Sequence, residues 1–184
     1  MDNTSVVIVG GGAVGCATAY YLARAGIETT LIESNSIANG ASGYAMGLLN
    51  PVSGTGIPGA WEELSRTGFL LHGGLSNELK EVTGSSYIVR RCESIHRAYT
   101  DEDVAALEVV ARCSDHVEGI SCRWLDGREV SSLEDRVSEG AFKALLLEGT
   151  LLVESYGYTE ALARGAERHG ALIRYAKALG IKRS

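Results

Sequence analysis

A glycine-rich turn directly after an apolar run constrains the fold of this chain more than any other feature. Residues 5–9 read SVVIV, and the turn from Gly10 to Gly15 reads GGGAVG. The apolar run is β-branched on both faces, which predicts a central strand of a parallel sheet that is covered on both sides. The turn matches Gly-x-Gly-x-x-Gly, a pattern that indicates dinucleotide binding when a strand precedes it and a helix follows it.

The residues after the turn supply that context. Apolar side chains recur at helical spacing over residues 13–25, and Gly26 is placed to end the helix in the left-handed conformation. Residues 29–33 (TTLIE) predict a second strand. Strand, helix and strand in this order form a right-handed βαβ unit, so the predicted fold class is α/β with a Rossmann-like parallel sheet.

The glycines of the turn each have a reason to be present in a dinucleotide site. Gly10 allows a sharp turn, Gly12 lets a pyrophosphate approach the backbone, and Gly15 allows the helix to pack closely on the strand. The amides of Ala13, Val14 and Gly15 are expected to be free. They would point at the phosphates, with the helix dipole adding to the attraction.

Glu33 stands eighteen residues after Gly15, where the second strand ends. A carboxylate at this place can accept hydrogen bonds from both hydroxyls of the adenosine ribose, and it repels a 2′-phosphate, which disfavours NADP. The simpler interpretation is a glycine turn between packed elements, with Glu33 exposed to solvent. Strand, helix, strand and acid in register favour the nucleotide site.

The remainder of the chain alternates between loop, helix and strand patterns. Residues 34–59 contain six glycines and both prolines, so they are expected to form a long irregular loop with a functional role. Further helices are expected over 61–82, 100–114, 127–133 and 158–169, and further strands over 87–91, 94–99, 142–147, 151–153, 171–176 and 178–181. The chain stops within this strand pattern, so the sheet is expected to be unfinished.

Composition excludes several classes of function. A net charge of −6 and a pI near 5.3 argue against binding to nucleic acid or to an anionic membrane surface. The four cysteines form no Cys-x-x-Cys pair and no cluster at zinc spacing, so no metal is expected and the thiols are expected to be reduced. Glycines interrupt the first apolar run, which is therefore not a signal peptide, and a cytoplasmic protein is expected.

The segment after Glu33 resembles a known family. Residues 39–51 (NGASGYAMGLLNP) are similar to the second flavin-binding segment of the D-amino-acid oxidase-like family, which includes glycine oxidase, sarcosine oxidase and amino-acid dehydrogenases. The resemblance extends over nearly the whole chain. It implies FAD as cofactor, a small amine or amino acid as substrate, and oxidation of a C–N bond by hydride transfer to flavin.

The resemblance also assigns cofactor contacts beyond the βαβ unit. It places Ser42 at the pyrophosphate, the run from Ala45 to Leu48 along the ribityl chain and flavin ring, and Ala178 at the adenine. The complete set of cofactor-binding residues predicted is Gly10, Gly12, Ala13, Val14, Gly15, Glu33, Ser34, Ala41, Ser42, Ala45, Met46, Gly47, Leu48 and Ala178.

By the same resemblance, residues 1–84 form an FAD-binding region, residues 85–150 form part of an α+β substrate domain, and residues 151–184 return to the first domain. The chain has roughly half the family length, and it ends before the region that holds the substrate carboxylate. No catalytic residue is therefore assigned, and either a missing C-terminal portion or a homo-oligomer is expected.

Two other functions stay open at this point. A truncated flavin- or nucleotide-binding module without turnover needs only the features present in this chain. A NAD-linked dehydrogenase could use the same βαβ unit. Retention of a yellow cofactor through gel filtration would separate FAD from NAD binding.

Overall fold

The structure, a computed structural model, describes residues 5–133 and 141–182 of the 184-residue chain. The chain divides into two compact units. The first unit comprises residues 1–47, 74–89 and 153–184, and the second comprises residues 48–73 and 90–152. Relative to the bounds expected from the sequence, residues 48–73 and 151–152 group with the second unit, and residues 85–89 group with the first.

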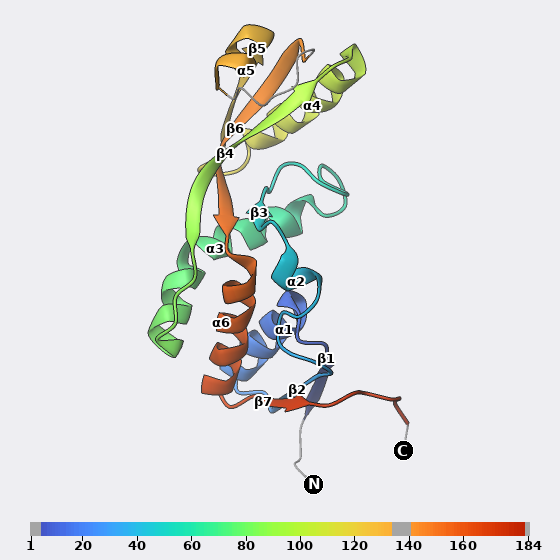
Figure 1. Cartoon of the computed structure of the whole chain (residues 1–184), viewed down its shortest axis with the longest axis vertical. Helices are drawn as coiled ribbons and strands as arrows, with labels where there is room; N and C mark the ends of the chain where they lie inside the picture. Colours follow the sequence, from blue (N-terminus) through green and yellow to red (C-terminus); the bar gives the residue numbers. More distant parts are fainter. Residues whose placement is uncertain (1–4, 134–140, 183–184) are drawn as a thin grey trace. The chain divides into compact units, whose positions relative to one another are not determined.

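The first unit contains the βαβ arrangement expected from the sequence (Figure 1). Strand β1 (Val6–Val9) leads into helix α1 (Ala13–Arg24), which is followed by strand β2 (Thr29–Glu33). Strand β7 (Leu172–Tyr175) completes a parallel three-stranded sheet in the order β1-β2-β7. The α/β fold class with a parallel sheet is confirmed.

The core of the first unit lies where α1 packs against α6 (Ser155–Arg168) and one face of the sheet. Tyr20 is fully buried there, and Gly165 of α6 gives its ring room, since a Cβ at this glycine would meet the ring at 2.8 Å. The buried residues of this core are Cys16, Ala19, Tyr20, Ala23, Leu31, Ile37, Ala38, Leu75, Leu79, Ala161, Leu162, Ala163, Ala166 and Ala171.

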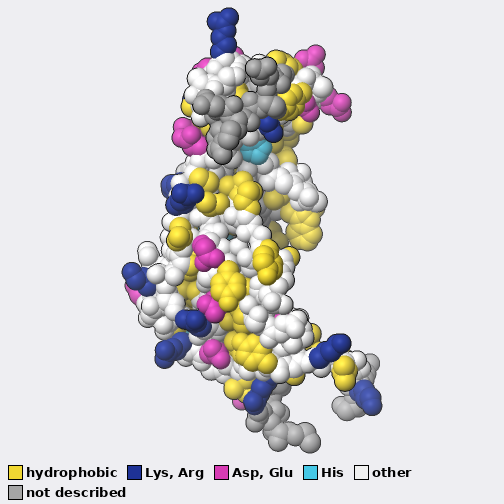
Figure 2. Space-filling view, in the orientation of Figure 1, with side chains coloured by type: hydrophobic (Ala, Val, Ile, Leu, Met, Phe, Trp, Pro, Cys, Tyr) yellow, Lys and Arg dark blue, Asp and Glu magenta, His cyan; other side chains and the backbone are white. Residues whose placement is uncertain are grey.

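The expectation that β1 is a central strand covered on both sides is wrong for the described residues. β1 lies at one edge of the sheet. Val7 and Val9 are 54% and 62% exposed, and Leu172 of β7 is 40% exposed, whereas Ile8 packs against the core. Exposed hydrophobic side chains are also visible in the space-filling view (Figure 2). The β-branched residues on the outer face therefore have no helix of the described chain over them.

This open apolar face is expected to make the isolated chain dimerise or aggregate. Replacing Val7 and Val9 together with threonine should raise the monomer fraction in sedimentation velocity. Because threonine also favours strands, the free energy of unfolding should change by only about 0.5 kcal/mol.

Ile8→Thr is the matched control. It places a hydroxyl against the core, so it should destabilise the chain by about 1–3 kcal/mol. A wild-type chain that stays monomeric at all concentrations would contradict the expected association.

The second unit is built on an antiparallel sheet. Its long strand β6 (Lys143–Val153) pairs with β3 (Leu48–Leu49) and β5 (Ser121–Asp126), and it neighbours β4 (Val89–Ala98). Helices α4 (Asp101–Ser114) and α5 (Gly127–Leu133) contact β5, and buried residues of β5, α5 and β6 form a small core. Helix α3 (Glu62–Thr83) begins in the second unit and ends in the first.

Several local expectations are confirmed and others are wrong. Helix α4 begins where the sequence predicts a helix, with Thr100 and Asp103 forming a capping box, and α5 begins at Gly127 as predicted. β4 and β6 are each one continuous strand where the sequence predicted two, and β6 continues through Gly149, whose φ is 91°. β5 was missed, and the expected loop over 34–59 contains the short helix α2 (Ala41–Tyr44) and β3.

The strand expected over residues 178–181 is wrong as well, since these residues are exposed and have no regular structure. All four cysteines are free thiols, as expected. In the described part of the chain, no helix is both long enough and apolar enough to cross a membrane.

Candidate functional site

The glycine turn joins β1 to α1 at the carboxyl end of the parallel sheet, which is where α/β folds place their ligands. Gly10 has a φ of 110°, a left-handed conformation that a larger residue rarely adopts. A Cβ on Gly15 would overlap the carbonyl oxygen of Gly10. Both positions therefore require glycine for the turn itself.

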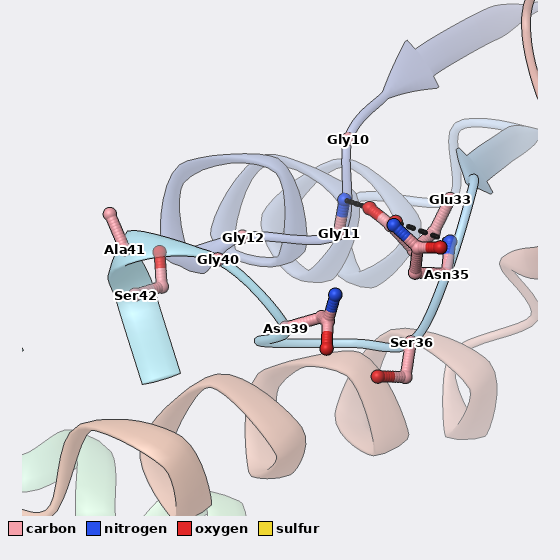
Figure 3. A pocket seen from close by; sticks show the side chains of 10 residues that line it. All are labelled: Gly10, Gly11, Gly12, Glu33, Asn35, Ser36, Asn39, Gly40, Ala41 and Ser42. Carbon is pink, nitrogen blue, oxygen red and sulfur yellow. Dashed lines mark hydrogen bonds between the residues drawn. The ribbon is translucent and has the colours of Figure 1, made fainter. Parts of the chain in front are cut away.

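The Glu33 carboxylate lies beside this turn and is held by backbone amides (Figure 3). The Gly11 amide donates to Oε2 at 2.6 Å, and the Asn35 amide donates to Oε1 at 2.7 Å. The Ser34 hydroxyl also donates to Oε1, at 3.2 Å. These donors, the Gly11 amide above all, hold the pKa of Glu33 below the ordinary glutamate value, so the group is an anion at neutral pH.

Ser42 lies at the other side of the turn, over the first residues of α1. Its hydroxyl oxygen accepts a hydrogen bond from the Ala13 amide at 2.9 Å. A Cβ on Gly12 would meet the same oxygen at 3.0 Å. The Ala13 amide is therefore paired in this structure, where the sequence led us to expect a free donor.

A pocket of about 240 Å³ lies between the turn and residues 33–42. Figure 3 shows Glu33 and Asn35 on one side of it and Ser42 and Ala41 on the other. Its lining residues are Gly10, Gly11, Gly12, Glu33, Asn35, Ser36, Asn39, Gly40, Ala41 and Ser42. Five of these were predicted from the sequence, namely Gly10, Gly12, Glu33, Ala41 and Ser42.

Sequence reasoning missed the other five lining residues. Gly11 lines the pocket through its backbone amide. The glycine pattern alone does not show which amide of the turn contacts the pocket. Asn35 lies two residues after Glu33, the acid that ends β2. A short polar residue at this position favours a turn, and the backbone amide of that turn can bind the carboxylate. Ser36 belongs to the polar loop before the flavin-like segment, and Asn39 and Gly40 are the first two residues of that segment.

The remaining predicted residues lie outside the pocket lining. Val14 is 83% exposed at the start of α1, and Gly15 packs beneath the turn. Ala178 lies two residues beyond Ala176, whose amide donates to the Glu33 carbonyl at 2.9 Å. Leu48 belongs to β3 of the second unit.

The predicted ring-side segment continues from α2 and is fixed at two carbonyl groups. The Ser155 hydroxyl donates to the carbonyl oxygen of Ala45 at 2.7 Å, and the Val153 amide donates to that of Gly47 at 2.9 Å. Gly47 has a φ of 80°, and a Cβ there would overlap the Val153 carbonyl oxygen. Met46 is nevertheless 77% exposed, so its side chain is open to a ligand.

Outside the pocket, the titratable groups of the described residues show no assembled catalytic set. Burial lowers the pKa of His72 and of His96, so both rings are neutral at neutral pH. Burial raises the pKa of the Cys16 thiol to about 12, with the Glu33 charge adding to the effect, which makes this thiol unreactive. Within residues 5–133 and 141–182, no group of three or more His, Cys, Asp or Glu side chains could hold a metal ion.

The arrangement suits an adenine dinucleotide. Backbone amides at a helix N-terminus bind phosphate oxygens. An anion held by two amides keeps further lone pairs with which it can accept hydrogen bonds from hydroxyl groups. The two features lie at opposite sides of one pocket, as a phosphate and a ribose hydroxyl do in a nucleotide.

Comparison with known proteins gives consistent matches. A family model described as DAO, FAD dependent oxidoreductase, matches residues 5–184. A glycine oxidase from Bacillus licheniformis is 30% identical over 96% of this chain and 46% of its own length. A 4-methylaminobutanoate oxidase from Paenarthrobacter nicotinovorans is 31% identical over 94% of this chain and 20% of its own length.

A solved structure shows the same arrangement of elements. The crystal structure of glycine oxidase from Geobacillus kaustophilus matches with a TM-score of 0.80 and 28% identity, over 94% of this chain and 46% of that one. The chain therefore spans less than half the length of these relatives.

Proposed function

Because this chain belongs to the family of FAD-dependent oxidoreductases, we propose that its first unit binds FAD in the pocket between the glycine turn and residues 33–42. The observation that carries the proposal is the Glu33 carboxylate, fixed by the Gly11 and Asn35 amides beside the start of α1. FAD is the cofactor of the family, and these residues fit its adenylate half.

The residues at the start of α1 would hold the pyrophosphate. Gly12 leaves the backbone open to phosphate oxygens, and the amides of Ala13, Val14 and Gly15 lie at the positive end of the helix dipole. Ser42 already accepts from the Ala13 amide, so its own hydroxyl proton is available to donate to a phosphate oxygen.

The other cofactor contacts follow the family resemblance. Glu33, with Ser34 beside it, would accept from the ribose hydroxyls, and Ala178 would lie at the adenine. Ala41 would line the pyrophosphate side, while Ala45, Met46, Gly47 and Leu48 would line the ribityl chain and the ring. Apart from Leu48, these residues belong to the first unit, which would be the FAD-binding part, and the second unit would be part of the substrate domain.

We propose that the whole protein oxidises the C–N bond of a small amino acid or secondary amine. When bound, FAD supplies the acceptor for the hydride. The glycine oxidase and the 4-methylaminobutanoate oxidase among the relatives support this class of substrate. The cytoplasmic location expected from the sequence stays a prediction, and no catalytic residue is assigned.

The absorbance spectrum of the purified chain tests the cofactor proposal. After incubation with FAD and gel filtration, the protein fraction should keep the flavin bands near 450 nm, and denaturation should release them into the small-molecule fraction. The same experiment with NAD in place of FAD should leave no nucleotide on the protein. A colourless protein fraction with retained NAD would overturn the proposal in favour of a NAD-linked enzyme.

A further inference from the structure

The Ser155 hydroxyl makes a contact that neither the pattern of glycines nor the predicted site residues include. Ser155 is the first residue of α6, next to the N-cap position from which serine side chains often cap a helix. Here the Glu154 carboxylate does that instead, accepting from the amides of Tyr156 and Gly157 at 3.1 and 2.8 Å. The Ser155 hydroxyl is thus free for another role, and it donates to the Ala45 carbonyl at 2.7 Å, across 110 positions of sequence.

This hydrogen bond fixes the orientation of one peptide group. In a trans peptide the carbonyl and the following amide point in opposite directions, so holding the Ala45 carbonyl also directs the Met46 amide. Ala45 is exposed and Met46 is 77% exposed, so packing alone does not fix this peptide. The next fixed point is the Gly47 carbonyl, which accepts from the Val153 amide at 2.9 Å.

Both fixed points lead to the same short stretch of chain, since Val153 ends β6 and Ser155 begins α6. Ser155 is itself held, because its carbonyl accepts from the Thr159 hydroxyl at 2.8 Å. The start of α6 is therefore a rigid support for residues 45–47. Those residues come directly after α2, whose Ser42 lies on the pocket.

We propose that Ser155 is a positioning residue for the flavin end of the cofactor, acting through the Ala45–Met46 peptide. The inference rests on the proposed function, because it assumes that residues 45–47 face the ring. Ser155 takes no part in the adenylate side, where Glu33 and the Gly12–Ala13 turn bind. Removing the Ser155 hydroxyl should therefore weaken binding of the flavin half of FAD and leave binding of the adenylate half unchanged.

Ser155→Ala tests this on the full chain. Alanine is a good helix former and the Glu154 cap stays, so the variant loses only the hydroxyl. Its dissociation constant for FAD should rise by about two- to tenfold, the effect of one ordinary hydrogen bond. Its dissociation constant for ADP, which contains only the adenylate half, should stay within about twofold of wild type. Isothermal titration calorimetry measures both.

Two further variants separate a positioning role from general damage. Ser155→Thr keeps a hydroxyl and should restore the wild-type ratio of FAD to ADP affinity. Glu33→Gln should weaken FAD and ADP together, because both ligands contain the ribose that Glu33 binds. If Ser155→Ala leaves FAD affinity unchanged, or weakens ADP as much as FAD, the positioning role is overturned. If the wild-type chain binds neither ligand, the proposed function itself fails.

Discussion

Replacing Gly15 with alanine is expected to abolish FAD binding and to lower the free energy of unfolding by about 1–3 kcal/mol. The added Cβ would overlap the Gly10 carbonyl oxygen, and it would also meet the Ile8 side chain at 3.4 Å. The obstacle is backbone rather than the tip of a flexible side chain. The helix must therefore move away from the strand, which takes the amides of its first turn out of the pocket.

The measurement combines thermal denaturation with titration of FAD into the folded variant. For a chain of this size, each kcal/mol corresponds to a shift of about 2–4 °C in melting temperature. A Gly15→Ala variant that melts like wild type and binds FAD equally well would show that the turn is not packed as described.

Gly68→Ala is the matched control for this change. Gly68 lies in α3, and a Cβ there meets nothing within 4 Å. The substitution adds the same methyl group, but in a helix interior it removes the conformational freedom of glycine. It should therefore stabilise the chain by up to about 1 kcal/mol and leave FAD binding unchanged.

The βαβ unit could be predicted from sequence because its determinants are local. The turn needs glycine at Gly10 for its φ and at Gly15 for its packing, and both reasons act within a few residues of the motif. β2 follows from the run Thr-Thr-Leu-Ile, which is rich in β-branched residues and ends in Glu33. The position of that acid beside the turn then follows from the pairing of two adjacent parallel strands.

The rest of the site depends on contacts between distant segments. The Ser42 hydroxyl reaches the Ala13 amide across 29 positions, and Ser155 reaches Ala45 across 110. A hydroxyl residue in a loop or at a helix start gives no sign of which carbonyl or amide it will meet. The family resemblance pointed to Ser42, but Ser155 lies before the helix predicted over 158–169, and no pattern singled it out.

Burial was the other property that the sequence did not determine. The pattern of β1 is the same on both faces, but Ile8 packs against the core while Val7 and Val9 are exposed. A strand pattern reports which residues tolerate burial and does not report whether another element covers them. For the same reason the apolar stripe of α3 divides, with Leu75 and Leu79 buried while Leu64 and Leu71 are exposed.

Glu33→Gln is expected to weaken FAD binding by about 1–3 kcal/mol, or roughly 5- to 150-fold in the dissociation constant. Glutamine has nearly the same shape as glutamate, but only one of its terminal atoms accepts hydrogen bonds. Both Glu33 oxygens accept from backbone amides, Gly11 on one and Asn35 on the other. In the variant, one of these amides would face an NH₂ group, so the side chain must turn away from its present place beside the ribose site.

The same substitution predicts a change in how stability depends on pH. The pKa of Glu33 is lowered in the folded chain, chiefly by the Gly11 amide, so the carboxylate stabilises the fold at neutral pH. That contribution is lost as the pH falls below the ordinary glutamate range, near 4, and through the lowered pKa. The difference in unfolding free energy between wild type and Glu33→Gln should therefore be largest at neutral pH and should shrink in acid.

A second charge-neutralising variant separates this local effect from the loss of one negative charge. Glu167 is exposed on α6, and Glu167→Gln changes the net charge by the same amount without touching the turn. It should leave the FAD dissociation constant at its wild-type value. If Glu167→Gln and Glu33→Gln weaken FAD equally, general electrostatics accounts for the effect. In that case the carboxylate fixed by the Gly11 and Asn35 amides has no part in holding the ribose.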